Sequence, residues 1–289
     1  ISNNVTLSTM HGCPAEEIEQ IGRYLITERG LHTTIKLNPT LLGPKQLRHI
    51  LNEQQQFDVF VPDEAFKHDI QFTDAIAMIR RLQQAADEKN VSFSIKLTNT
   101  LETINHRHSL PESENTIYMS GRALHPISIA VAEKLQSEFD GALDISFSAG
   151  ADCFNTPEIV AAGLTPVTIC SDLLKPGGYT RLAQYLPELK SVMREHKAGS
   201  VEDFVLQKSR VKTKDVIFAA LKNLADYSLK AVKDEKYQKN DALNLSIKTQ
   251  RSLPPFDCIK APCVETCPTN QNVPEYMRLV QKNESAAAF

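Results

Sequence analysis

Short apolar runs alternate with stretches of helical periodicity from Val5 to about Leu186. The runs are rich in β-branched residues and nearly continuous in apolar character, which is typical of parallel strands covered on both faces. The segments between them carry apolar residues at helical spacing and begin near Pro14, Pro126 and Thr156. Six strands are predicted: Val5–Ser8, Thr33–Leu37, Asp58–Val61, Ser92–Leu97, Leu143–Phe147 and Val167–Cys170.

This alternation predicts an α/β fold with a parallel sheet and helical crossovers. Polar clusters follow three of the predicted strands, at Lys36–Thr40, Lys96–Thr100 and Ser146–Gly150. Polar residues at many successive strand ends favour a closed (β/α)8 barrel over an open sheet, which gathers them at one switch point. Six units are fewer than eight, so we expect a partial TIM barrel whose first strands precede Ile1.

Beyond about Thr180 the helical periodicity continues without further strands. A capping box at Ser200–Asp203 begins one helix, and Lys212–Tyr237 is a long amphipathic stretch. No GxGxxG or Walker A sequence occurs, so no dinucleotide-binding domain is expected within this chain. We predict a partial TIM barrel over residues 1–185, a helical connector over 186–250 and a third unit over 251–289.

Composition and charge exclude several classes of function. The 289 residues are 42% hydrophobic and 23% charged, with a formal net charge of −3, as in ordinary globular proteins. Without a broad basic face, we expect no nucleic-acid partner. No apolar run reaches the roughly 18 residues of a membrane span. The few, unevenly placed cysteines do not form a secreted disulfide framework, so a reducing, cytoplasmic location is expected.

The C-terminal region concentrates cysteine: Cys258, Cys263 and Cys267 fall within ten residues, and Pro268 follows. Iron–sulfur clusters need several converging thiolates, which closely spaced cysteines followed by proline commonly supply. Zinc normally uses CxxC pairs and a complete tetrahedral set, and neither is present. Three unrelated thiols are the remaining alternative. We interpret these cysteines as iron–sulfur ligands.

The run Cys-x4-Cys-x3-Cys-Pro-Thr-Asn, followed by Val-Pro-Glu-Tyr, resembles the helical ferredoxin domain of glutamate synthase small subunits and dihydropyrimidine dehydrogenase. That family has one more cysteine three residues earlier, where this chain has Pro255. The resemblance implies the beginning of a helical 4Fe–4S domain over residues 251–289. Cys258 and Cys263 would serve one cluster and Cys267 a second, with further ligands from a later cysteine group.

The motif Ile-Lys-Leu occurs twice in the predicted barrel, around Lys36 and Lys96. A lysine within an apolar strand is costly unless it is paired or faces a polar cavity. Each amine could therefore lie beside a flavin ring or an anionic substrate, or simply form a salt bridge or face solvent. Asn38, Thr98 and Asn99 could hydrogen-bond a ring edge, or could be ordinary turn residues.

The loops after the last two predicted strands contain Ser148–Ala151 and Cys170–Asp172. In barrels these loops frequently build a phosphate site from backbone N–H groups. An ordinary turn is the alternative, because one glycine is a weak signal.

Five segments, in this order along the chain, resemble the FMN-binding barrel of dihydroorotate dehydrogenases and dihydropyrimidine dehydrogenase: Lys36–Pro39, Thr98–Thr100, Met119–Pro126, Ser148–Ala151 and Ile169–Ser171. The resemblance implies bound FMN. The ring-side residues would be Lys36, Asn38, Lys96, Thr98 and Asn99, and the phosphate-side residues Ser148, Gly150 and Ser171.

The candidate catalytic residues lie directly after the first predicted strand. The same family reads Leu-Ser-Cys-Pro-His-Gly there, whereas this chain reads Leu-Ser-Thr-Met-His-Gly-Cys-Pro. Thr9 replaces the acid cysteine, and Cys13 follows four residues later. Compared with a cysteine thiol, a threonine hydroxyl is a poor proton donor. Cys13 is therefore either a displaced acid or a buried structural thiol.

Thr6–Pro14, Thr34–Gly43, Ile95–Glu102 and Phe256–Pro268 also resemble the selenate reductase-type iron–sulfur flavoprotein subunit of bacteria, over nearly the whole chain. This resemblance implies a longer parent chain with FAD- and NAD(P)H-binding parts. Other redox subunits and a small-molecule substrate would be its partners.

Three functions fit these features. The first is an electron-transfer subunit that passes electrons between NAD(P)H and a substrate or partner. The second is a catalytically degenerate barrel that acts as a docking scaffold. The third is a lyase or aldolase that uses Lys36 or Lys96 as a Schiff-base nucleophile.

Overall fold

The computed structural model of the protein describes residues 2–9, 11–106, 110–111, 113–175, 177–239, 268, 271–282 and 284–288. Its main sheet contains four parallel strands in the order β1–β2–β3–β6. Val167 adds a parallel bridge to Phe147 at the β6 edge. The strands are β1 (Asn4–Ser8), β2 (His32–Leu37), β3 (Phe93–Leu97) and β6 (Ile145–Phe147).

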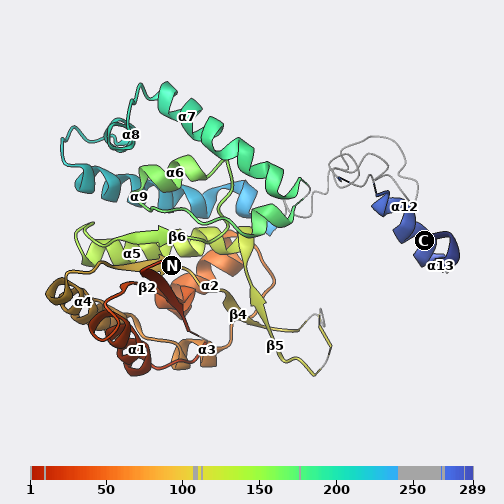
Figure 1. Ribbon diagram of the computed structural model, residues 1–289, viewed down its shortest axis with the longest axis horizontal. Coiled ribbons are helices and arrows are strands. Elements are labelled where there is room, and N and C mark those ends of the chain that lie inside the picture. Colours follow the sequence, from red (N-terminus) through yellow and green to blue (C-terminus); the bar gives the residue numbers. More distant parts are fainter. Residues whose placement is uncertain are drawn as a thin grey trace.

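Helices cover one face of this sheet and bury its apolar side chains (Figure 1). Ile35 and Ile95 are at most 1% exposed and belong to the same core as Leu82 and Ile127. This apolar face explains why the strands form, because burying a side chain of this size contributes about 2 kcal/mol. The main helices of this layer are α1 (Ala15–Thr27), α4 (Phe72–Lys89) and α5 (His125–Glu138).

The opposite face of the sheet is polar, and we call it the inner face. Side chains alternate along a strand, so the residues paired in register with Lys36 share its face. Within this face Thr34 Oγ1 and Ser94 Oγ are 2.7 Å apart. The inner face consists of Thr6, Ser8, Thr34, Lys36, Ser94, Lys96 and Ser146. A parallel sheet with helices on one face and this polar row on the other is a partial (β/α)8 barrel, as predicted.

One predicted strand, Asp58–Val61, is wrong. The segment lies outside the sheet, and its residues form no strand. Asn52 Nδ2 donates to the carbonyl oxygens of Phe57 and Val59, both at 2.8 Å, so a side chain occupies acceptors that a neighbouring strand would use. Five parallel segments are therefore present in the described residues, where six were predicted.

Several short elements between and after the strands were not predicted. The antiparallel hairpin β4 (Leu101–Ile104) and β5 (Thr116–Met119) follows β3 in the chain and projects from the body of the molecule (Figure 1). The short elements are η1 (Pro39–Leu42), α2 (Pro44–Arg48), η2 (His49–Gln54), α3 (Asp63–His68), η3 (Gly121–Leu124), η4 (Ser171–Leu174) and η5 (Gly178–Gln184).

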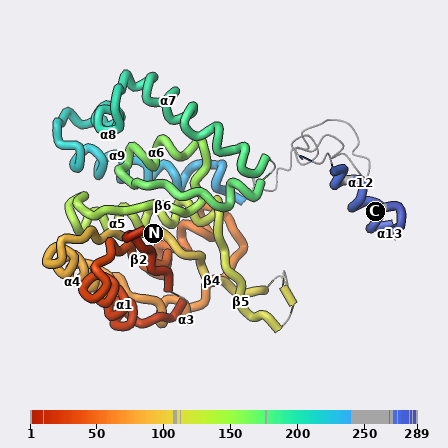
Figure 2. Tube along the Cα trace, in the orientation of Figure 1, coloured from red at the N-terminus to blue at the C-terminus, as the bar shows by residue number. Residues whose placement is uncertain are grey.

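The later helices gather at one end of the molecule, opposite α1 and α4 (Figure 2). They are α6 (Thr156–Ala161), α7 (Tyr185–Glu195), α8 (Val201–Lys208), α9 (Val216–Lys233) and η6 (Glu235–Tyr237). The predicted cap of α8 is present, because Ser200 Oγ accepts from the Asp203 N–H at 3.1 Å.

Two further helices, α12 (Val273–Gln281) and α13 (Ser285–Ala288), follow along the chain. Among the described residues, no helix has both the length and the apolar character needed to cross a bilayer.

Candidate functional site

Lys36 and Lys96 are nearest neighbours on the inner face, because β2 and β3 pair them in register. Lys96 Nζ donates to Thr168 Oγ1 at 2.7 Å, in the segment that follows Val167. Within the part of the chain that the structure describes, neither amine forms an ion pair with a carboxylate. The strand ends therefore hold two adjacent cations without a matching anion.

The surroundings of these amines favour a bound anion. Burial lowers the pKa of Lys36, and the nearby Cys170 thiol partly opposes this change. Burial also lowers the pKa of Lys96, and the charge of Lys36 lowers it further. Partial burial and the adjacent charge both disfavour the charged form of these amines, and an anionic group placed between them would favour it.

Asn99 connects three strand ends. It accepts a hydrogen bond from Ser8 Oγ at 2.8 Å, and its Nδ2 donates to Asn38 Oδ1 at 2.7 Å. Within the described residues Asn38 Nδ2 donates to no acceptor, so this amide can still serve a ligand. Thr98 is placed differently: its hydroxyl is buried against Ser128 of α5 at 2.8 Å.

The three predicted phosphate-side residues also fall into two groups, because the loops of Gly150 and Ser171 lie together and Ser148 is bound elsewhere. A Cβ on Gly150, whose φ is +59°, would lie 2.5 Å from Gly121 O, and a Cβ on Gly121 would lie 3.3 Å from Ser171 Oγ. The loops that carry Gly150 and Ser171 therefore meet at Gly121. Ser148 bonds instead to β3, because its N–H and its hydroxyl both donate to Leu97 O, at 2.7 and 3.2 Å.

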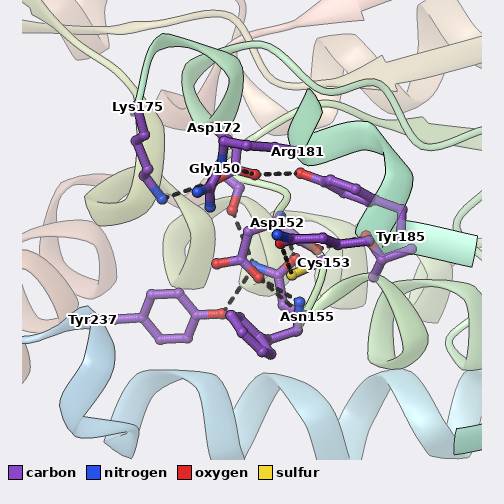
Figure 3. Close-up of polar contacts among 12 residues, drawn as sticks. Gly150, Asp152, Cys153, Asn155, Asp172, Lys175, Arg181, Tyr185 and Tyr237 are labelled. Atoms are coloured by element: carbon purple, nitrogen blue, oxygen red, sulfur yellow. Dashed lines mark hydrogen bonds and ion pairs between the residues drawn. The ribbon is translucent and has the colours of Figure 1, made fainter. Parts of the chain in front are cut away.

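A buried carboxylate anchors the loop that carries Ser171. Asp172 is 2% exposed and accepts hydrogen bonds from Lys175, Arg181 and Tyr185 at 2.9, 2.9 and 2.7 Å (Figure 3). Burial alone would raise the pKa of Asp172, but these donors lower it to about 2. The loop therefore presents no uncompensated negative charge that would repel a phosphate.

The candidate catalytic residues Thr9 and Cys13 are brought together. The side chains of Thr9 and Glu17 lie close enough to the Cys13 thiol to affect its pKa in opposite directions. Burial raises the pKa of Cys13, and the neighbouring Glu17 carboxylate raises it further. The thiol therefore stays protonated near neutral pH, which suits a proton donor as well as a packed core residue.

The same loop contains a histidine network that we did not predict. Asp69 is 3% exposed and accepts from the Gly12 N–H at 3.0 Å and from Thr40 Oγ1 at 2.7 Å. His11 Nδ1 lies 3.4 Å from Asp69 Oδ2, and its Nε2 lies 3.4 Å from Thr100 Oγ1. Burial opposes ionisation of Asp69, yet the bonds from His11, Thr40 and Gly12 lower its pKa.

Cys258, Cys263 and Cys267 lie outside the described residues, so their role as iron–sulfur ligands stays a prediction. In the part of the chain that is described, no group of three or more His, Cys, Asp or Glu side chains is placed to hold a metal ion.

Residues 1–239 match the protein family described as "Oxidoreductase YgfK, N-terminal TIM-barrel domain". Two relatives, from Escherichia coli strain K12 and from Escherichia coli O157:H7, are both named "Putative oxidoreductase YgfK" and are 42% identical over 287 residues. The alignment covers 99% of this chain but only 26% of each relative. The predictions of a TIM barrel and of an oxidoreductase are thus confirmed at this general level. The chain belongs to the family of YgfK oxidoreductase N-terminal TIM-barrel domains.

Proposed function

We propose that this chain is the FMN-binding barrel of an iron–sulfur flavoprotein oxidoreductase. The observation that carries the proposal is the pair Lys36 and Lys96, adjacent on the inner face and without a carboxylate partner in the described residues. An adjacent pair of cations is an expensive arrangement unless a ligand supplies the opposite charge.

The residues at the strand ends fit this cofactor. FMN combines a phosphate with a ring whose polar edge accepts hydrogen bonds, so it needs cations and amides at one end and backbone donors at the other. Lys36, Lys96 and Asn38 supply the first set. The Gly150 and Ser171 loops, which meet at Gly121, supply the second. When bound, the flavin would contribute the transfer of hydride or single electrons.

The protein's own groups have separate tasks in this proposal. The hydroxyl of Thr168 holds Lys96 in place, so the amine presents its charge at a defined position. The Ser8–Asn99–Asn38 chain orients the free amide N–H of Asn38. Cys13 is held beside Thr9 as a neutral thiol and is the candidate proton donor.

In the larger protein, we propose that electrons pass between NAD(P)H and a substrate or partner subunit through FAD and the clusters bound by Cys258, Cys263 and Cys267. This would make the chain part of a selenate reductase-type iron–sulfur flavoprotein subunit. Support comes from the cysteine spacing, from the oxidoreductase family and from the greater length of the relatives.

Flavin analysis of the anaerobically purified parent chain tests the proposal. We expect one FMN per chain, identified by chromatography after release. Lys36→Met and Lys96→Met should each weaken FMN binding about tenfold, because a charge-assisted hydrogen bond contributes roughly 1.5–3 kcal/mol. Lys89→Met, at the exposed end of α4, is the matched control and should change nothing. A folded barrel that binds no FMN would refute the proposal.

A second candidate is a barrel that no longer catalyses and instead docks redox partners. Two observations favour it: Thr9 replaces a cysteine, and Ser148 is occupied by its bonds to Leu97. It predicts a folded parent protein that has its iron–sulfur clusters but lacks FMN in the barrel.

A further inference from the structure

We propose that Asn155 and Tyr237 position the Ala149–Gly150 loop to receive the flavin phosphate, so that the segment after α9 forms part of the cofactor site. This inference rests on the proposed function. It names positioning residues that belong to neither the ring-side nor the phosphate-side set.

Asn155 directs its amide at the loop. The side chain is fully buried, and its Oδ1 accepts from the Asp152 N–H at 2.8 Å. Its Nδ2 donates to Gly150 O at 3.0 Å and to the Tyr237 hydroxyl at 3.2 Å (Figure 3). Both amide hydrogens and the amide oxygen are therefore used. Loss of any one contact would leave a buried polar group unpaired, which is costly.

The His125 side chain holds the carbonyl of Ala149, the residue before Gly150. His125 is fully buried, and burial lowers its pKa to about 3, so the ring is neutral. Its Nδ1 lies 2.7 Å from Ala149 O, which can only accept, so Nδ1 carries the proton. Its Nε2 then accepts from the Tyr227 hydroxyl at 2.6 Å. The Tyr237 ring stacks on the imidazole with centroids 5.0 Å apart.

Anchoring these two carbonyls also orients two N–H groups. In a trans peptide, the C=O of one residue and the N–H of the next point in opposite directions. Because the oxygens of Ala149 and Gly150 face the buried cluster, the N–H groups of Gly150 and Ala151 point away from it. Neither N–H donates to an acceptor among the described residues, so both are available to an anion.

The cluster draws on distant parts of the chain. Tyr237 lies in η6, and the Lys239 N–H donates to Gln55 O at 2.8 Å, which secures the residues after η6 against η2. Tyr227 belongs to α9. The geometry of the β6–α6 loop is therefore set by Tyr227 and Tyr237, which lie more than seventy residues further along the sequence.

The test compares FMN with riboflavin, which lacks the phosphate. Apoprotein of the parent chain is dialysed to equilibrium with each flavin, and bound flavin is quantified by chromatography. Wild type should prefer FMN. Tyr237→Phe keeps the ring on His125 but removes the hydroxyl, and Asn155→Ala removes the amide. Each should reduce the preference for FMN about tenfold, or about 1.4 kcal/mol, and leave riboflavin binding unchanged.

Asn223→Ala is the matched control. Asn223 is also a buried amide, and its Nδ2 donates to Ala161 O and Val205 O, away from the loop. It should lower Tm without changing the preference for FMN. If Tyr237 had a purely structural role, Tyr237→Phe would weaken the binding of FMN and of riboflavin equally, and this result would overturn the inference. An unchanged preference for FMN in Tyr237→Phe would also overturn it, as would a wild type that binds both flavins equally. A wild type that binds neither would refute the proposed function itself.

Discussion

Some charged side chains in this protein have a partner of opposite charge from the same fold, and others do not. Asp172 is almost fully buried, and donors from Lys175, Arg181 and Tyr185 surround it. Lys36 and Lys96 lie side by side and lack a carboxylate partner in the described chain. A buried charge is tolerated when a matching group is present. The carboxylate site is thus complete within the protein, whereas the lysine pair is where we propose that a ligand supplies the opposite charge.

The hydrogen bonds to the Asp172 carboxylate should make the free energy of unfolding depend on pH, and replacing Asp172 should remove this dependence. The folded-state pKa of about 2 lies below the ordinary 3.8, so the contribution is fully present above about pH 4 and is lost as pH falls through 2. Asp172→Asn should lower the free energy of unfolding by about 2 kcal/mol at pH 7. Urea unfolding at a series of pH values should show a flatter profile for the variant between pH 4 and 2.

The control for this experiment is Asp63→Asn. Asp63 also pairs with an arginine, Arg48, but its side chain is 66% exposed. Its removal should change stability little, because surface pairs contribute little. If Asp172→Asn behaved like Asp63→Asn, the buried ion-pair cluster would have no role in holding the loop.

Substitutions at Gly150 and Gly30 can separate the cost of a left-handed backbone from the cost of a steric clash of the added Cβ. Their φ angles are +59° and +61°, but an added Cβ would clash with Gly121 O only at Gly150, whereas nothing lies within 4 Å at Gly30. Gly30→Ala should therefore cost about 1 kcal/mol from the left-handed backbone alone. Gly150→Ala should cost roughly 1–3 kcal/mol more from overpacking. Equal losses in urea unfolding would contradict the close approach of the two loops.

Part of the site follows from the sequence at single positions. The repeated Ile-Lys-Leu motif places Lys36 and Lys96 in identical strand contexts, and the parallel register then aligns them. The histidine network was not predictable in this way. His11 and Asp69 are separated by 58 residues, and their contact depends on where α3 packs, which no local pattern encodes. The sequence around His125 and Pro126 predicts only the beginning of a helix. The contacts of His125 with Ala149 O and the Tyr227 hydroxyl depend on tertiary packing.

Among the helices and strands, prediction succeeded where burial is regular. The strands β1, β2, β3 and β6 and the helices α1, α4, α5 and α6 were found, because the apolar side chains of β2, β3 and β6 are consistently buried and those of β1 alternate with exposed residues. The run Asp58–Val61 has the same composition, but Asn52 binds its carbonyls and Phe60 is 59% exposed. Composition alone therefore does not separate a strand from an extended surface segment.

The end of α7 offers a test of helix termination. Lys197 follows the helix with φ +56°, a conformation that favours glycine. Lys197→Gly should raise the free energy of unfolding by about 1 kcal/mol, because it removes the strain of a left-handed residue. Lys190→Gly, within the same helix, should lower it by a similar amount, about 1 kcal/mol. Thermal unfolding of both variants would measure this, and a loss in both would contradict the assigned helix end.

In the molecule as a whole, the helices after residue 185 pack on the barrel rather than only following it in sequence. Helix α9 packs against α5, α6 and α8. Leu224 is fully buried in the main core, and Tyr227 bonds to His125 of α5. A connector predicted over residues 186–250 and a barrel predicted over 1–185 therefore share one core. These boundaries stay a prediction, but the packing favours a folding unit that includes α9.

Hydrogen exchange of the whole chain distinguishes the two descriptions. If α9 belongs to the folding unit of the barrel, its slowest amides should exchange with the same free energy as those of α5, because both open only on global unfolding. The β4–β5 hairpin, where Tyr118 is 56% exposed, should exchange faster and serves as the internal reference. Leu224→Ala, which leaves a cavity between α9 and α5, should lower the protection of both helices together by about 2–5 kcal/mol. Exchange of α9 at a lower free energy than α5, with α5 unaffected by Leu224→Ala, would instead support a domain boundary near residue 185. The positioning role of Tyr237 would then depend on a separately folding segment, since that residue follows α9 directly.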